Sequence, residues 1–137
     1  MTTIIPYVNF NGNCREAMSF YKNCLGGELT LQKIWESPMA AHMPSEMANH
    51  VLHGKLVNKH IVLMGSDMRG ESLVKGNTIG LCLHCNSEKE MNEFYNTLQA
   101  GGKVKVELHQ SFWGATYAEL TDKFGVNWML HYSKANN

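Results

Sequence analysis

Apolar side chains recur at the spacing of an α-helix in two segments of the chain. In the first they are Cys14, Ala17, Met18, Tyr21 and Leu25, and in the second they are Met91, Phe94, Tyr95 and Leu98. Residues three, four and seven apart lie on one face of a helix, so each segment predicts a helix that buries a single apolar stripe.

Short apolar runs surround each predicted helix. TTIIPYVNF precedes the first helix, and ELTLQKIW, HVLHGKLV and KHIVLMG follow it; NTIGLCLHC precedes the second, and KVKVELHQ, ATYAELT and VNWMLHY follow it. Runs of this length that are rich in β-branched and aromatic residues are typical of strands. Both halves of the chain therefore predict the order strand, helix, strand, strand, strand.

The two predicted helices share their start and stop signals. Asn13-x-x-Glu16-x-x-x-Phe20-Tyr21 recurs as Ser87-x-x-Glu90-x-x-x-Phe94-Tyr95, and Gly26-Gly27 recurs as Gly101-Gly102. Asn or Ser can cap a helix N-terminus, and a Glu three residues later can complete a capping box. Each glycine pair can then end the helix, because glycine adopts a left-handed backbone. The agreement of caps, aromatic pair and stop indicates an internal repeat.

A helix that packs on a four-stranded sheet leaves the other face of that sheet open. We therefore predict one α+β domain over residues 1–137, made of two βαβββ modules at residues 1–73 and 74–137. Their strands are expected to form a curved mixed sheet, with the helices outside and a cup inside. A cup of this kind is typical of a small-molecule site.

Composition narrows the classes of partner. The 137 residues contain 12 Lys and Arg against 12 Asp and Glu, and only 18% are charged, so electrostatic binding of nucleic acid or of an anionic membrane is not expected. No apolar run approaches the roughly 20 residues that span a bilayer. The first residues, MTTIIPYVNF, have neither the charged region nor the cleavage site of a secretion signal. We therefore expect a cytoplasmic protein with reduced cysteines.

One cysteine pair has the spacing of a metal site. Cys82-Leu-His-Cys85 lies in the apolar run TIGLCLHC, which predicts a strand. Residues three apart in a strand point to opposite faces, so the two sulfur atoms would not converge on a metal. A structural zinc site is the disfavoured alternative to four small buried residues.

Two stretches carry a resemblance to a known family. They are Tyr7-Val-Asn-Phe-Asn-Gly-Asn-Cys-Arg-Glu-Ala17 with Phe20-Tyr21, and Gln110-Ser-Phe-Trp-Gly114 with Tyr117 and Thr121-Asp-Lys-Phe-Gly-Val-Asn-Trp-Met129. They resemble the PhnB-like branch of the vicinal oxygen chelate superfamily, which contains glyoxalase I, extradiol dioxygenases, and bleomycin- and fosfomycin-resistance proteins. The resemblance covers essentially the whole chain and implies the paired-module fold and a homodimer. Some members are described as ubiquinone methyltransferases, but this sequence has no glycine-rich strand–turn–helix loop for an adenosyl cofactor.

The resemblance also implies a metal, held by His, Glu or Gln side chains on the first and last strands of each module. Laid onto this sequence, the four ligand positions fall at Pro6 or Tyr7, near Leu63, within Gly80–Cys82, and at Met129. None of them is His or Glu, and thioether or aliphatic side chains do not replace the donors that a divalent ion of this class needs. We therefore expect no resident metal. The alternative is a shifted register in which His131 or His84 supplies a ligand.

The candidate ligand-binding residues come from the inward positions and from the aromatic motifs. They are Tyr7, Asn9, Leu63, Phe112, Trp113, Tyr117, Met129 and His131. Met129 and His131 share one face of the last strand, whereas Trp128 and Leu130 share the other, so one set should face the helix and the other the cup. The Phe112-Trp113-Gly114 run fits either a packed corner or an aromatic lining of the cup.

The connection between the second and third strands is rich in methionine. Met39, Met43 and Met47 lie four residues apart, and Pro44 interrupts any single helix there. We expect a mobile flap or packed loop, with an oligomer contact or a soft-metal site as alternatives. His53 begins the next strand without a role that the sequence assigns.

Three functions are compatible with these patterns. The first is a metal-independent protein that binds a small apolar or planar molecule in its cup. The second is a lyase, isomerase or dioxygenase-type enzyme of the same superfamily, using either a metal or Tyr7, His53 or His131 as acid–base groups. The third is a protein with a vestigial pocket whose surface mediates association.

Overall fold

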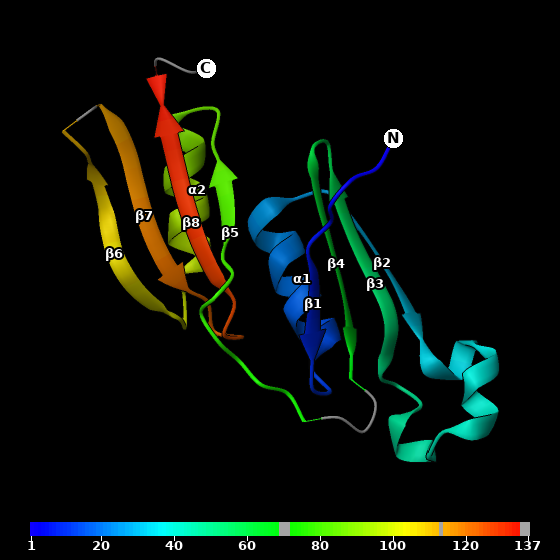
Figure 1. The fold of residues 1–137 in the computed structure, drawn as a ribbon. Helices are drawn as coiled ribbons and strands as arrows, with labels where there is room; N and C mark the ends of the chain where they lie inside the picture. The colour runs from blue at the N-terminus through cyan, green and yellow to red at the C-terminus, as the bar shows by residue number, and fades with distance from the viewer. Residues whose placement is uncertain (69–71, 113, 135–137) are drawn as a thin grey trace. The chain divides into compact units, whose positions relative to one another are not determined.

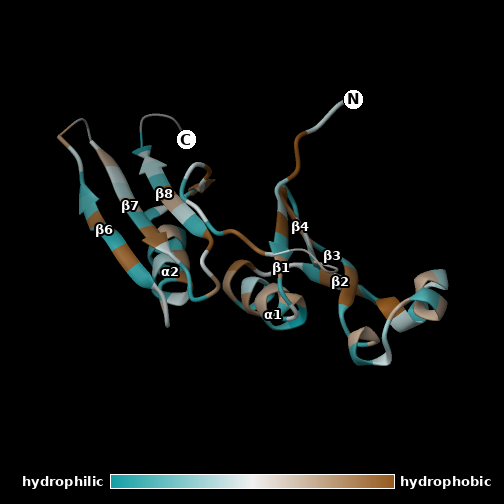
Figure 2. Ribbon diagram, turned by 60° about the horizontal axis from the view of Figure 1, so that its bottom comes forward, coloured by the Kyte–Doolittle hydropathy of each residue, from teal (hydrophilic) through white to brown (hydrophobic). Residues whose placement is uncertain are grey.

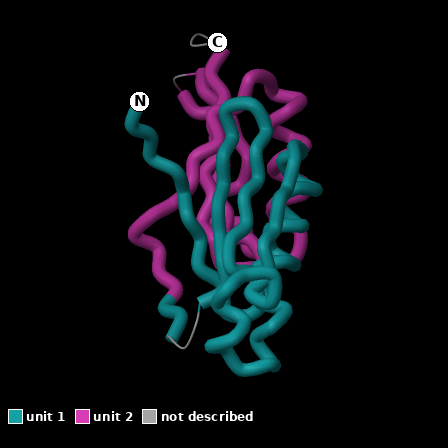
Figure 3. The backbone as a smooth tube through the Cα atoms, turned by 90° about the vertical axis from the view of Figure 1, so that its right-hand side faces the viewer, with its two compact units in different colours: residues 1–74 teal, residues 75–137 magenta. Residues whose placement is uncertain are grey.

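The computed structural model describes residues 1–68, 72–112 and 114–134. The chain divides into two compact units, residues 1–74 and 75–137 (Figure 3). Each unit contains one α-helix and one four-stranded mixed sheet (Figure 1). Each also has the predicted order strand, helix, strand, strand, strand, which confirms the α+β fold of paired βαβββ modules. In the described residues no helix is both long and apolar enough to cross a membrane.

The first unit builds its sheet around a parallel pair of strands. Its elements are β1 (Tyr7–Phe10), α1 (Cys14–Leu25), β2 (Glu28–Lys33), β3 (Val51–Asn58) and β4 (Ile61–Asp67), and the strand order is β1-β4-β3-β2. Strand β1 pairs with β4 in parallel, whereas β2, β3 and β4 form an antiparallel meander. Helix α1 packs on β2, β3 and β4 and buries Met18 and Tyr21 completely.

The second unit repeats this arrangement. Its elements are β5 (Leu81–His84), α2 (Glu88–Leu98), β6 (Lys103–Gln110), β7 (Ala115–Thr121) and β8 (Asn127–Ser133), in the strand order β5-β8-β7-β6. Hydrophobic and hydrophilic positions alternate along β6, as Figure 2 shows, and this is the pattern of a strand with two different faces. Helix α2 packs on β7 and β8.

The helix starts confirm one of the two predicted caps. The Ser87 hydroxyl accepts the Glu90 N–H at 3.1 Å, and the Glu90 carboxylate accepts the Asn86 N–H at 3.1 Å. Asn13, in contrast, makes no side-chain cap, so that prediction is wrong. The buried Asp67 carboxylate caps the start of α1 instead, because its Oδ1 accepts the N–H groups of Gly12 and Cys14 at 2.8 and 3.0 Å. The same carboxylate accepts the Val51 N–H through Oδ2 at 2.8 Å and so ties β3 to the helix start.

The glycine pairs after the helices have two separate roles. Gly26 and Gly101 adopt φ values of +77° and +76°, as predicted for residues that end a helix. The second glycine of each pair instead lies against the backbone of a neighbouring strand end. A Cβ on Gly27 would overlap the Val57 carbonyl oxygen, and a Cβ on Gly102 would overlap that of Thr121. The repeat therefore preserves a packing requirement as well as a turn.

The methionine-rich connection forms short 3₁₀ helices at Pro38–His42 and Ser45–Met47. Pro44 separates the two, which agrees with the expected break in any single helix. Met39, Met43 and Met47 are all half-buried, so each lies against the first unit without entering its core. Whether the segment moves as a flap stays a prediction.

Candidate functional site

The sheet of the second unit has one face that α2 does not cover. Trp128 and Leu130 of β8 and Leu120 of β7 are at most 3% exposed and lie on the helix-covered face. Neighbouring side chains along a strand point to opposite faces, so the residues between them lie on the open face. Met129 and His131 are therefore on the open face, which confirms that the two sets of β8 residues separate as predicted.

Four ring-bearing side chains form one row across this open face. The strand register pairs His84 with His131, His131 with Tyr117, and Tyr117 with His109. The rings of His84 and His131 have centroids 4.9 Å apart, and those of His109 and Tyr117 are 6.4 Å apart in an edge-to-face arrangement. We call these four residues the ring row. Each comes from a different strand, so the sheet register fixes their order.

A second row of polarisable and acidic side chains lies beside the ring row. Cys82, Met129 and Glu119 pair across β5, β8 and β7. Burial raises the pKa of Tyr117 above its ordinary value, and the hydrogen bond and negative charge of Glu119 raise this pKa further. The Tyr117 phenol therefore stays protonated at neutral pH and can donate a hydrogen bond.

Cys82 and Cys85 differ in exposure, as expected for side chains on opposite faces, but the expectation that all four cysteines are buried is wrong for Cys82. Cys82 is exposed on the open face, whereas Cys85 is buried. Burial, with a smaller effect from nearby carboxylates, raises the pKa of both Cys14 and Cys85 to about 12. Burial also raises the pKa of Cys82, but its sulfur remains accessible.

We expect iodoacetamide to alkylate Cys82 roughly tenfold or more faster than Cys14 or Cys85, because the buried thiols are both shielded and protonated. Mass spectrometry of the native protein at mildly alkaline pH, followed over time, gives the order of modification. A Cys82→Ser variant should lose the fast phase. Equal rates at Cys82 and Cys14 would contradict the burial described here.

The first unit has its own open sheet face. Tyr7 and Asn9 of β1 lie on it, beside their register partners Met64 and Ser66 of β4. The Tyr7 hydroxyl lies 3.5 Å from Nδ1 of His53, and the two ring centroids are 6.0 Å apart. His53, to which the sequence gave no role, is therefore the polar neighbour of Tyr7.

Two of the predicted site residues lie elsewhere. Leu63 is 2% exposed and pairs with the buried Leu56 under α1, so its expected place on the inner, open face is wrong. A shift of one position along a strand exchanges the two faces, and Val62 and Met64 take the open positions instead. Phe112 is 97% exposed in the connection between β6 and β7, which excludes the packed corner for its ring. Trp113 lies outside the described residues.

Sequence reasoning also missed members of the site. His109 and Glu119 lie on the open face, and neither was a candidate. The alternation in KVKVELHQ and ATYAELT divides the residues of each strand between two faces. Which residues of β6 share a face with which residues of β7 depends on two register shifts, between Val104 and Val106 and between Val106 and His109. Irregularities of this kind have no reliable local sequence signal.

Comparison with known proteins agrees with the class that the fold defines. The structure of the fosfomycin resistance protein FosX from Listeria monocytogenes, with Mn(II) and sulfate, matches with a TM-score of 0.64 at 11% identity, over 97% of this chain and 93% of that one. This is the paired-module fold of the vicinal oxygen chelate superfamily, as predicted.

The sequence narrows the class to a family. Residues 2–131 match the family described as 3-demethylubiquinone-9 3-methyltransferase, and the chain belongs to this family. The protein YjdN of Escherichia coli K12 is 30% identical, over 94% of each chain. The structure of PA1353 from Pseudomonas aeruginosa has a TM-score of 0.87 at 34% identity, over 97% of this chain and 98% of that one. A PhnB protein of Bacillus cereus, described with the same methyltransferase name, has a TM-score of 0.78 at 20% identity, over 96% and 100%.

The donors on the open faces can be tested against the metal that the superfamily implies. The first and last strands of each unit pair Tyr7 with Met64 and Cys82 with Met129. A phenol, a thiol and two thioethers do not match the carboxylate and imidazole donors that hard divalent ions take. Among the described residues, no group of three or more His, Cys, Asp or Glu side chains is arranged to hold a metal ion. These positions do not fit the superfamily's metal.

Proposed function

We propose that this protein binds a small planar or amphipathic molecule on the open face of the β5–β8 sheet, without a metal. The observation that carries this proposal is the ring row, which presents three imidazoles and a phenol side by side. Aromatic and imidazole rings offer a flat, polarisable surface with a hydrogen-bonding edge, and a ring pair contributes about 0.5–1.5 kcal/mol beyond its buried area. Met129 adds an adaptable apolar contact beside the rings.

The polar groups near the ring row determine which hydrogen-bonding groups of a ligand they can pair with. The protonated Tyr117 hydroxyl donates its one hydrogen to the Glu119 carboxylate, so the phenol oxygen and the carboxylate both offer acceptors to a ligand donor. The His109 Nδ1 lies 2.8 Å from the Glu107 carbonyl oxygen, which can only accept, so Nδ1 carries a proton and Nε2 is left for other contacts. A flat molecule with a polar edge is the ligand class that these groups favour.

The family is named for methyltransferase activity, but the β1–α1 loop of this chain does not support that activity. A methyltransferase needs a loop whose free backbone N–H groups and glycines receive an adenosyl cofactor. Here the β1–α1 loop has a single glycine, Gly12, and the N–H groups of Gly12 and Cys14 both donate to the buried Asp67. The loop that would receive the cofactor is therefore occupied by the protein's own carboxylate.

One observation favours a second candidate, a metal-dependent lyase or isomerase. The rings of His84 and His131 lie next to one another, one row along the strands from Cys82 and Met129. Two neutral imidazoles could bind a borderline ion such as Zn²⁺ or Cu²⁺. In that case the metal would supply Lewis-acid activation when bound, and the two imidazoles would orient it.

Ligand-detected NMR with a library of small planar molecules tests the proposal. We expect hits whose affinity falls roughly tenfold in His131→Ala, because the central ring of the row is lost. His60→Ala is the matched control, since His60 is exposed in the turn between β3 and β4. Hits with equal affinity for His131→Ala and for the parent protein would contradict the proposal. Stabilisation by Zn²⁺ or Cu²⁺ that disappears in His84→Ala would favour the second candidate.

A further inference from the structure

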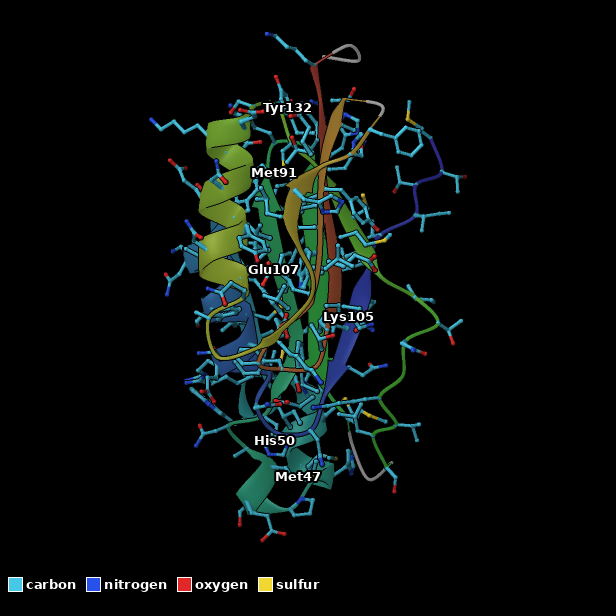
Figure 4. The ribbon with its side chains drawn as sticks, turned by 90° about the vertical axis from the view of Figure 1, so that its left-hand side faces the viewer. Met47, His50, Met91, Lys105, Glu107 and Tyr132 are labelled. Atoms are coloured by element: carbon cyan, nitrogen blue, oxygen red, sulfur yellow. The ribbon has the colours of Figure 1, made fainter. Side chains whose placement is uncertain are left out.

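A hollow lies between α2 and β6, on the helix-covered side of the second unit's sheet. Its volume is about 270 Å³, and its lining residues are Glu88, Met91, Asn92, Leu108, His109, Gln110 and Thr116. We call it the α2–β6 hollow. Met91 lies on the sheet side of α2, and Figure 4 labels it beside the helix. A volume of this size suits a fragment-sized molecule rather than a large cofactor.

The hollow exists because α2 covers less of its sheet than α1 does. Helix α1 packs on three strands, whereas α2 packs on β7 and β8. Six residues of α1 are buried, but only Met91 and Leu98 of α2 are. The edge strand β6 therefore extends beyond the helix, and its inner-face residue Leu108 stays half-buried. Gln110, Thr116 and Tyr132 pair across the end of the sheet beside the start of α2.

The lining of the hollow combines one negatively charged side chain with neutral polar and apolar ones. Glu88 is exposed at the first position of α2, and its carboxylate gives the lining its negative charge. Asn92, Gln110 and Thr116 add neutral polar groups, and Met91 and Leu108 add an apolar wall. At the helix N-terminus the Ser87 hydroxyl accepts the N–H group of Glu90, so one of the first-turn donors is already paired.

A neighbouring hollow sets the orientation of a ligand. It has a volume of about 230 Å³, shares Glu88 and Gln110, and is also lined by Gly114, Tyr132 and Lys134. The Lys134 ammonium disfavours a second positive charge there. A cation at Glu88 would therefore direct its apolar part along Met91 and Leu108.

We propose that the α2–β6 hollow binds a small organic cation, a primary ammonium or guanidinium group that carries a short apolar chain. The cation pairs with the Glu88 carboxylate, and the chain packs on Met91 and Leu108. His109 also lines this hollow and belongs to the ring row, but the proposed contacts, with Glu88, Met91 and Leu108, do not use it. The two proposals can therefore be tested separately.

The test is a ¹H–¹⁵N NMR titration of the whole protein with n-butylammonium, n-butylguanidinium, n-butanol and n-butyrate. We expect the two cations to shift the amide signals of Glu88, Met91, Gln110 and Thr116. We expect n-butanol to bind more weakly and n-butyrate not to bind. Glu88→Gln should weaken the cations roughly fivefold, as for a partly exposed charge pair. Glu93→Gln removes a charge from the same helix outside the hollow and should leave their affinity unchanged.

Three outcomes would overturn the proposal. One is equal affinity of the cations for Glu88→Gln and for the parent protein. Another is binding of n-butyrate at the same amides with the strength of n-butylammonium. The third is the absence of shifts at these four amides when n-butylammonium is far above millimolar concentration.

Discussion

Replacing Asp122 with alanine is expected to lower the free energy of unfolding by about 4 kcal/mol, because two buried donors and one part-buried donor lose their acceptor at once. The Asp122 side chain is 3% exposed. Its Oδ1 accepts the N–H groups of Phe124 and Val126 at 2.8 and 3.1 Å, and its Oδ2 accepts the Trp128 indole N–H at 2.8 Å. One carboxylate thus holds both the β7–β8 turn and the largest side chain of β8.

Urea unfolding followed by far-UV circular dichroism measures this effect. Asp122→Asn should fall between the parent protein and Asp122→Ala, because the amide keeps one acceptor oxygen and places N–H groups where the other was. Glu93→Ala, at an exposed helix position, should change the stability by no more than about 0.5 kcal/mol. A loss below about 1 kcal/mol in Asp122→Ala would contradict the role given to this carboxylate.

Gly27→Ala is expected to cost more than about 3 kcal/mol, through two separate effects. Gly27 has a φ of +96°, which is strained for any residue with a Cβ. The new Cβ would also overlap the Val57 carbonyl oxygen and lie 2.7 Å from the Cβ of Asn58. The first neighbour is backbone, so the strand end itself would have to move.

Gly114→Ala separates these two effects. Gly114 has a φ of +88°, but a Cβ there meets nothing within 4 Å. Its substitution should therefore cost only the backbone strain, about 1 kcal/mol. Gly76→Ala has neither the strain nor a neighbour and should be close to neutral. If Gly27→Ala and Gly114→Ala lose the same stability in urea, the close approach of Gly27 is not a constraint on the fold.

The elements of this fold were predictable because their signals are local. The helical spacing of Cys14, Met18 and Tyr21 and the period of two in VNWMLHY depend only on neighbouring residues. The turn at Asp122 and Gly125 likewise has residue types that are typical of turns, and a hydrogen bond from the Gly125 N–H to the Asp122 carbonyl closes it.

The site was only partly predictable because it depends on register. Met129 and His131 were correctly assigned to the same face, since the alternation along one strand is enough to group them. Leu63 was misplaced by a single position, and His109 joined the row through irregular pairing between two strands. The cap of α1 comes from Asp67, which is distant in sequence and carries no local sign of that contact. Interactions between remote residues of this kind need the folded chain.

Methionine-methyl NMR tests the central claim most directly, because the chain has nine methionines in different environments. Met129 lies on the open face, Met18 and Met91 are at most 1% exposed, and Met39, Met43 and Met47 lie in the 3₁₀ connection. With a planar hit added to ¹³C-methyl-labelled protein, we predict that the Met129 signal shifts while those of Met18 and Met91 stay in place. A hit that moves the Met39, Met43 or Met47 signals and leaves Met129 unchanged would contradict binding at the ring row.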